Sequence, residues 1–127
     1  LELFQDALDA IRDAIHAATV LFGEDSLTVA TEMYHEALTL YKMGVALAQR
    51  GDPASGGNYL MALDKLERVD EIQEGILGDE EVERASTAQL LGSVHLANGD
   101  HKQARKQFER ALSLRIKLFG RANIMTA

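Results

Sequence analysis

Apolar residues recur every three or four positions along most of this chain, and that period is typical of amphipathic helices. In the first such stretch, residues 1–22, Ala7, Ile11 and Ala14 share one side while acidic residues occupy another. Four more stretches with this period follow, at residues 26–50, 53–77, 80–98 and 101–119. The last stretch is expected to bury Ala104, Phe108, Ala111, Leu112 and Leu118. The pattern predicts an all-α chain.

A glycine follows each apolar stretch, and glycine readily takes the left-handed conformation that closes many helices. Residues that cap the next helix come soon afterwards: Ser26, Asp52 with Pro53 behind it, Asp79 and Asp100. We therefore expect helices to end just before Gly23, Gly51, Gly78, Gly99 and Gly120. Residues 121–127 are then the start of a further helix, and the chain is expected to be part of something longer.

A three-residue pattern, two apolar residues and a glycine, occurs at residues 21–23, 76–78 and 118–120. Each copy ends an apolar stretch and precedes a polar helix start, which indicates a repeat of the kind that builds helical solenoids. We therefore interpret residues 1–127 as a single array. Its parts are the second helix of a partial repeat (1–23), an extended repeat (24–78), a further repeat (79–120) and the start of another helix (121–127).

Small and large residues occupy fixed places in residues 85–111: Gly92, Ala104 and Ala111 are small, and Leu91 and Phe108 are large. Small residues let two antiparallel helices approach closely, while the large ones fill the space between them. Counted from Ala85, these places are those of the tetratricopeptide repeat (TPR) motif, and the stretch resembles that family, with Ala88 in place of its leading tryptophan. The resemblance implies a right-handed superhelix of antiparallel helix hairpins.

The spacing of the glycines adds two expectations. Gly78 and Gly120 are 42 residues apart, and this period, with its apolar-apolar-glycine ending, resembles the longer repeats of kinesin light chains. That resemblance implies a motor-cargo adaptor. Gly23 and Gly78 are 55 residues apart, so both helices of residues 24–78 are predicted to be extended by about two turns. This hairpin is expected to project about 10 Å beyond its neighbours, at the ends away from its turn.

Members of the TPR family usually bind a peptide or helix of another protein on a concave face, which the first helix of each pair lines. The resemblance implies that the lining here consists of Leu38, Tyr41, Val45, Ala48, Gln49, Ser86, Gln89, Ser93, Leu96 and Ala97. These residues are apolar or uncharged, and Gln89 and Ser93 stand where chaperone-binding members carry groups that grip a terminal carboxylate. An acidic peptide is therefore not the expected partner. Alternatively, the lining packs against a helix of the same chain or of another copy.

The formal net charge of −7 hides a strong asymmetry between the two ends of the chain. Residues 1–83 contain 18 acidic and 5 basic residues, whereas residues 84–127 contain 2 acidic and 8 basic residues. Opposite ends of opposite sign favour head-to-tail contact between copies. An alternative function is therefore self-association into a dimer or a head-to-tail assembly, although ordinary solvated helix faces also explain the asymmetry.

The sequence lacks the residue combinations of a catalytic, metal or cofactor site. It has no cysteine, and its 4 histidines do not have the i, i+4 spacing of a metal site. No glycine-rich phosphate loop or nucleophile motif occurs, so we expect a non-catalytic protein without a cofactor or metal.

The remaining expectations concern partners and location. The basic side of residues 101–119 has no exposed aromatic residue for stacking, which argues against nucleic acid as a partner. No membrane span or export signal is visible, so a cytoplasmic protein is expected. A regulatory module attached to a catalytic or motor domain elsewhere is a third class of function that the sequence leaves open.

Overall fold

The computed structural model describes the backbone of residues 1–78 and 81–126 and the side chains of residues 1–78 and 81–120. It contains five helices: α1 (Glu2–Phe22), α2 (Leu27–Gln49), α3 (Ser55–Ile76), α4 (Val82–Ala97) and α5 (His101–Thr126). No strand occurs in the part of the chain so described. The prediction of an all-α array of antiparallel helices is confirmed, whereas the expected cap at Asp79 lies outside the described residues.

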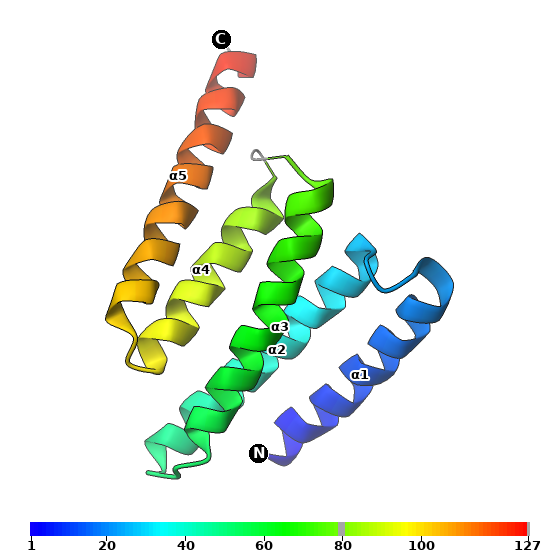
Figure 1. The fold of residues 1–127 in the computed structure, drawn as a ribbon, viewed down its shortest axis with the longest axis vertical. Helices are drawn as coiled ribbons and strands as arrows, with labels where there is room; N and C mark the ends of the chain where they lie inside the picture. Colours follow the sequence, from blue (N-terminus) through cyan, green and yellow to red (C-terminus); the bar gives the residue numbers. More distant parts are fainter. Residues whose placement is uncertain (79–80, 127) are drawn as a thin grey trace.

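The helices are stacked in chain order, and each packs against the next (Figure 1). α2 and α3 form one antiparallel pair and α4 and α5 a second, while α1 packs against α2 at one end of the stack. The backbones of α2 and α4 also contact each other, whereas those of α3 and α5 do not within the described residues. Because the first helices lie closer together than the second helices, the array curves towards α2 and α4. The surface of α2 and α4 on that side is the concave face.

The turns inside the two pairs have the same structure, as expected of a repeat. Gly51 and Gly99 have φ angles of 70° and 82°, a conformation that glycine adopts without strain. In the first turn the N–H of Asp52 donates to the carbonyl of Leu47 at 2.9 Å, and the N–H of Asp100 makes the equivalent bond at 2.9 Å in the second. These bonds are those of the Schellman motif. The helix ends predicted from these two glycines are confirmed.

An aromatic ring that lies on a glycine holds each pair together. A Cβ atom on Gly44 would come within 2.7 Å of the Tyr59 ring, and one on Gly92 within 2.6 Å of the Phe108 ring. Cβ atoms in proteins do not approach other atoms so closely, so only glycine permits these contacts. The small and large residues that suggested the repeat therefore pack directly against each other.

The hydrophobic core lies between the helices, and its main cluster joins α1, α2, α3 and α4 through residues such as Leu8, Leu40, Leu66 and Val94. Most positions that the apolar pattern assigns to the core are buried or half-buried. Leu112 is an exception: its side chain is exposed, and Leu114 is buried instead. The reason is that no helix within the described chain covers the side of α5 on which Leu112 lies.

The predicted lengthening of residues 24–78 holds for its first helix. α2 has 23 residues and α4 has 16, so α2 is longer by seven. Gly44 and Gly92 are equally far from their turn glycines, so the extra residues of α2 lie at the end away from the turn.

The second helices depart from the prediction. α3 has 22 residues and α5 has 26, so α3 is not the longer helix. α5 continues through Gly120 to Thr126, and residues 121–126 extend this helix instead of starting a new one. Gly120 does not end the helix because its backbone is not in the left-handed conformation that closes α2 and α4.

Candidate binding face

A hollow opens on the concave face between the amino-terminal halves of α2 and α4. Its volume is about 210 Å³, which is room for one long side chain. It is lined by Thr31, Tyr34 and His35 of α2, by Val82, Glu83 and Ser86 of α4, and by Gln73 of α3. Gln73 is 5% exposed and its Oε1 accepts a hydrogen bond from the buried hydroxyl of Thr87 at 2.7 Å, which fixes the base of the hollow.

Among the ten lining residues expected from the sequence, Ser86 alone borders this hollow. Leu38, Tyr41 and Val45 continue along α2, where they are half-buried against the main core cluster. Gln89 and Ser93 are half-buried on α4, and the remaining residues are exposed towards the turns: Ala48, Gln49, Leu96 and Ala97. We call Leu38, Tyr41, Val45 and Leu96 the apolar strip. The hollow and the apolar strip together occupy much of the length of the two first helices.

Polar residues of α4 on this face are engaged with their neighbours. Oε1 of Gln89 accepts a hydrogen bond from Nη1 of Arg115 at 2.9 Å, so a basic residue of α5 reaches the edge of the concave face. The hydroxyl of Ser93 donates to the backbone carbonyl of Gln89 at 3.1 Å. Glu83 in the hollow and Arg115 at the edge place charged groups beside the uncharged residues that the sequence predicts for this face.

Tyr34 and His35 form the α2 side of the hollow. Burial raises the pKa of the Tyr34 phenol because the phenolate loses contact with water, and the nearby charge of Arg115 partly opposes this rise. The phenol is therefore neutral at physiological pH and can donate and accept hydrogen bonds. Nδ1 of His35 lies 3.8 Å from Oε2 of Glu32, and the two rings of Tyr34 and His35 meet edge to face.

Comparison with known families explains the repeated turns and glycine contacts. A family model described as tetratricopeptide repeat matches residues 36–117, from within α2 to within α5. The chain belongs to the tetratricopeptide repeat family. No curated protein matches the sequence. TPR arrays generally mediate contacts between proteins and are typically non-catalytic scaffolds.

The matched TPR segment contains all ten expected lining residues but leaves out Thr31, Tyr34 and His35. These three residues were also not among those expected from the sequence. Thr31 and Tyr34 precede Leu38 by seven and four residues, so one helical face carries all of them. Extending the family's lining pattern by two turns towards the amino terminus of α2 would have found them.

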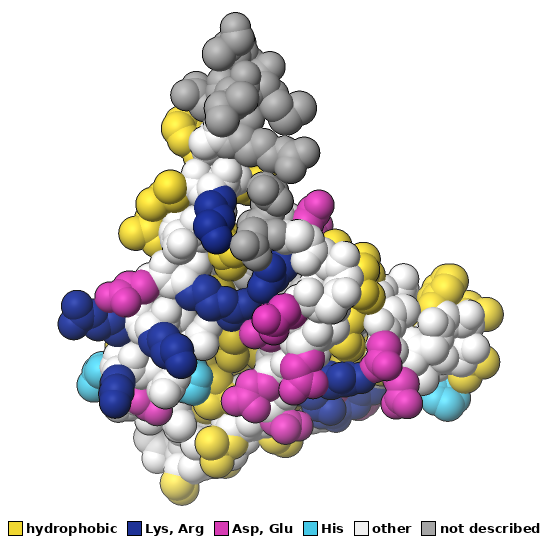
Figure 2. All heavy atoms as spheres, turned by 45° about the horizontal axis from the view of Figure 1, so that its top comes forward, with side chains coloured by type: hydrophobic (Ala, Val, Ile, Leu, Met, Phe, Trp, Pro, Cys, Tyr) yellow, Lys and Arg dark blue, Asp and Glu magenta, His cyan; other side chains and the backbone are white. Residues whose placement is uncertain are grey.

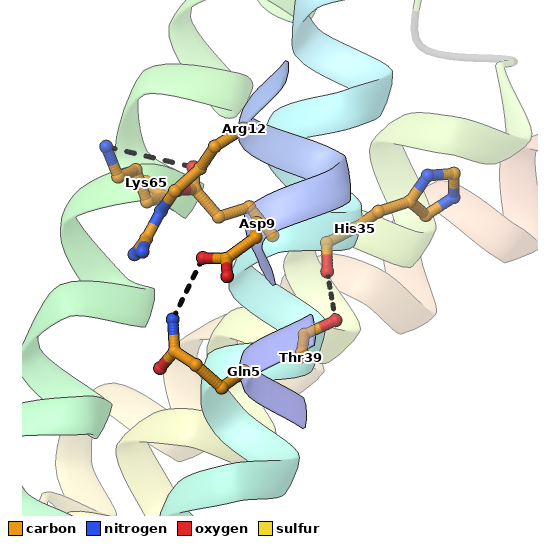
Figure 3. A network of polar contacts seen from close by, with 7 residues as sticks. Gln5, Asp9, Arg12, His35, Thr39 and Lys65 are labelled. Carbon is orange, nitrogen blue, oxygen red and sulfur yellow. Dashed lines mark hydrogen bonds and ion pairs between the residues drawn. The ribbon is translucent and has the colours of Figure 1, made fainter. Parts of the chain in front are cut away.

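The residue that follows His35 in α2 buries a carboxylate between α1 and α3 of this TPR array. Figure 3 shows Arg12 of α1 and Lys65 of α3 on that side of α2. The side chain of Glu36 is 3% exposed. Its Oε2 accepts a hydrogen bond from Nε of Arg12 of α1 at 3.0 Å, and its Oε1 lies 3.7 Å from Nζ of Lys65 of α3. Two cations from two helices thus compensate the charge that α2 buries.

The described part of this TPR array shows neither a membrane-spanning nor a metal-binding element. None of its helices has the length and apolar character needed to cross a membrane. Nowhere among the described residues do three or more His, Asp or Glu side chains gather as a metal site requires.

Proposed function

We propose that this TPR array is a non-catalytic adaptor that holds a peptide or helix of another protein on its concave face. The observation that carries the proposal is the hollow between α2 and α4, which leads into the apolar strip. A bound segment would place one side chain in the hollow and lay apolar side chains along the strip. This is the helix-in-groove or extended-peptide mode of recognition, in which a few anchors provide most of the affinity.

Exposed apolar side chains on this face support the proposal. Val82 at the hollow and Leu96 on the apolar strip are 57% and 49% exposed. Covering apolar surface stabilises a complex by roughly 25 cal/mol per Å² before the costs of association. A partner that covers both residues also covers the half-buried Leu38 and Tyr41 between them.

The polar groups of the face indicate which partners it does not suit. Gln89 and Ser93 take the places of the groups with which chaperone-binding TPR proteins hold a terminal carboxylate, and both are hydrogen-bonded within the array. Glu83 adds a negative charge to the hollow. We therefore infer that the partner segment is mainly apolar and not acidic. The long repeat period makes a cargo adaptor similar to kinesin light chains one form that this role can take.

Substitutions on the apolar strip test the proposal. Peptides that bind the chain are first selected from a displayed random library, and their affinity for variants is then measured by calorimetry. We expect Leu96→Ala to weaken binding about tenfold and Tyr41→Ala with Leu96→Ala to abolish it, because hot-spot residues contribute more than about 1 kcal/mol each. Circular dichroism checks that helicity is retained.

Met61→Ala is the matched control, since Met61 of α3 is 45% exposed and lies off the concave face. Its affinity for the selected peptides should equal that of the parent chain. Unchanged affinity in the Leu96→Ala variant, or equal losses in both variants, would place the site elsewhere.

A further inference from the structure

Both ends of the stack expose large apolar side chains, away from the concave face. On α5 they are Leu112, Ile116 and Phe119, which are between 59% and 74% exposed. The exposed Phe119 shows that the expectation of a basic helix without an exposed aromatic residue is wrong. On the outer side of α1 they are Leu3, Val20 and Leu21, which are between 72% and 84% exposed. Figure 2 shows hydrophobic side chains at the surface both beside the basic residues of α5 and at the far end of the molecule, over α1. Clusters of this kind mark surfaces that bind another protein.

The contact between α3 and α4 shows how an equivalent apolar surface is buried inside the array. Leu63 follows Tyr59 by four residues and Leu112 follows Phe108 by four, so the two leucines hold equivalent places in α3 and α5. Leu63 is 7% exposed, in a cluster with Leu91 of α4, whereas Leu112 is 59% exposed. The exposed side of α5 therefore matches a side of α3 on which a helix is packed.

The charges of α1 and α5 are complementary. Residues 2–22 contain four acidic residues and one basic residue, and residues 101–126 contain seven basic residues and one acidic residue. The exposed acids Asp6 and Asp13 precede the apolar end of α1, and the exposed bases Lys102 and Lys106 precede the apolar part of α5. Exposed charges therefore come before most of the exposed apolar residues on both helices. The exceptions are Leu3 at the start of α1 and the exposed bases Arg115 and Lys117 in the second half of α5.

The direction of the helices allows these patterns to meet in register. α1 and α5 lie at opposite ends of the stack, and both helices run upward from their amino-terminal ends in the view of Figure 1. A second copy shifted along the stack therefore brings its α1 alongside α5 of the first copy, with the two helices parallel. Acidic residues then face basic residues in the first halves, and apolar residues face each other in the second halves.

We propose that this chain associates with itself head to tail, with α1 of one copy packed on α5 of the next. The occupant of the exposed side of α5 is thus a second copy of the chain. Because the two surfaces differ, the contact is heterologous and leaves a free surface at each end, so assembly continues beyond a dimer. Salt weakens the charged half of the contact and leaves the apolar half.

Size-exclusion chromatography with light scattering over a concentration series tests the proposal. We expect the mass of the parent chain to rise with concentration and to fall when salt is added. Ile116→Ser should shift the concentration needed for association at least tenfold upwards. Leu60→Ser is the matched control, because Leu60 of α3 is 60% exposed and Ile116 is 61% exposed. The control should associate like the parent.

Charge reversal separates this contact from other modes of association. One variant carries Asp6→Lys and Asp13→Lys, and the other carries Lys102→Glu and Lys106→Glu. Each alone should associate more weakly than the parent chain, because its reversed residues then meet residues of the same sign on the other copy. An equimolar mixture should associate more strongly than either variant alone, because each surface of one variant complements a surface of the other.

Three results would overturn the proposal: a parent chain that is monomeric at all concentrations, association that neither reversal weakens, or a mixture that associates no more strongly than either variant alone. A monomeric parent would leave the exposed surface of α5 to a different protein. The concave face is not involved, so Leu96→Ala should not change the mass. Failure of self-association therefore leaves the adaptor proposal intact. Failure of peptide binding on the concave face likewise leaves the self-association proposal intact.

Discussion

Single glycines determine how closely the helices of each pair approach. A Cβ atom at position 92 would lie 2.6 Å from Cδ1 and Cε1 of Phe108, and the equivalent contact recurs between Gly44 and Tyr59. At this scale the sequence is a good guide, because the contact depends on side-chain size at two positions within one hairpin. Ser26 is a second local success: its Oγ accepts a hydrogen bond from the Val29 N–H at 3.1 Å, as a capping residue does.

Replacing Gly92 with Ala should destabilise the fold although Ala is the better helix former. Alanine contributes up to about 1 kcal/mol of helix propensity, but forcing the Phe108 ring aside costs roughly 1 to 3 kcal/mol. We expect a net loss of about 1 kcal/mol in the free energy of unfolding, measured by urea denaturation. Gly57→Ala is the control, because a Cβ there meets no atom within 4 Å, and it should be neutral or stabilising. If Gly92→Ala were as stable as Gly57→Ala, the Phe108 ring would have to move aside without cost, and the prediction would be wrong.

At the scale of helices, the buried Glu36 connects α1, α2 and α3. Arg12 is 46% exposed, and its removal leaves the carboxylate of Glu36 with Lys65 alone at 3.7 Å. A buried charge that loses its hydrogen-bonded partner is costly, so Arg12→Gln should lower the free energy of unfolding by about 1 to 3 kcal/mol. Hydrogen exchange of α1 amides should speed up more than that of α4 amides.

Arg68 provides the control for this change. Its partners Asp25 and Glu71 are 75% and 69% exposed, and such surface ion pairs stabilise by less than about 1 kcal/mol. Arg68→Gln should therefore have little effect. Combining Arg12→Met with Glu36→Leu should recover most of the stability lost in Arg12→Gln, because no uncompensated charge remains buried. Equal effects of Arg12→Gln and Arg68→Gln would argue against a role for Glu36 in holding α1.

The end of α5 shows where helix-level prediction from this sequence stops. The pattern at residues 118–120 is similar to that at 21–23, yet Gly23 ends α1 with φ 87° whereas Gly120 lies inside α5. Both glycines permit either conformation, so the surroundings decide. The exposure of Leu112 has a related cause, since burial depends on which helix packs there and not on the period of the apolar residues.

The concave face exists only at the scale of the whole array. The hollow is built from three helices, and its lining residues Thr31, Gln73 and Glu83 are distant in the sequence. The resemblance to the TPR family predicted one helical face of α2 and one of α4 as lining, but not the gap left between them. That gap depends on the relative placement of two helix pairs, which side-chain patterns within a pair do not determine.

The most direct test of the adaptor account is amide chemical-shift mapping of the isotope-labelled chain, titrated with a peptide selected from a displayed library. We expect shifts to concentrate in α2 and α4, around Tyr34 and Ser86 at the hollow and around Tyr41 and Leu96 on the apolar strip. The outer sides of α3 and α5 should stay unchanged. Shifts confined to those outer sides, with α2 and α4 unaffected, would contradict the assignment of the concave face as the binding site.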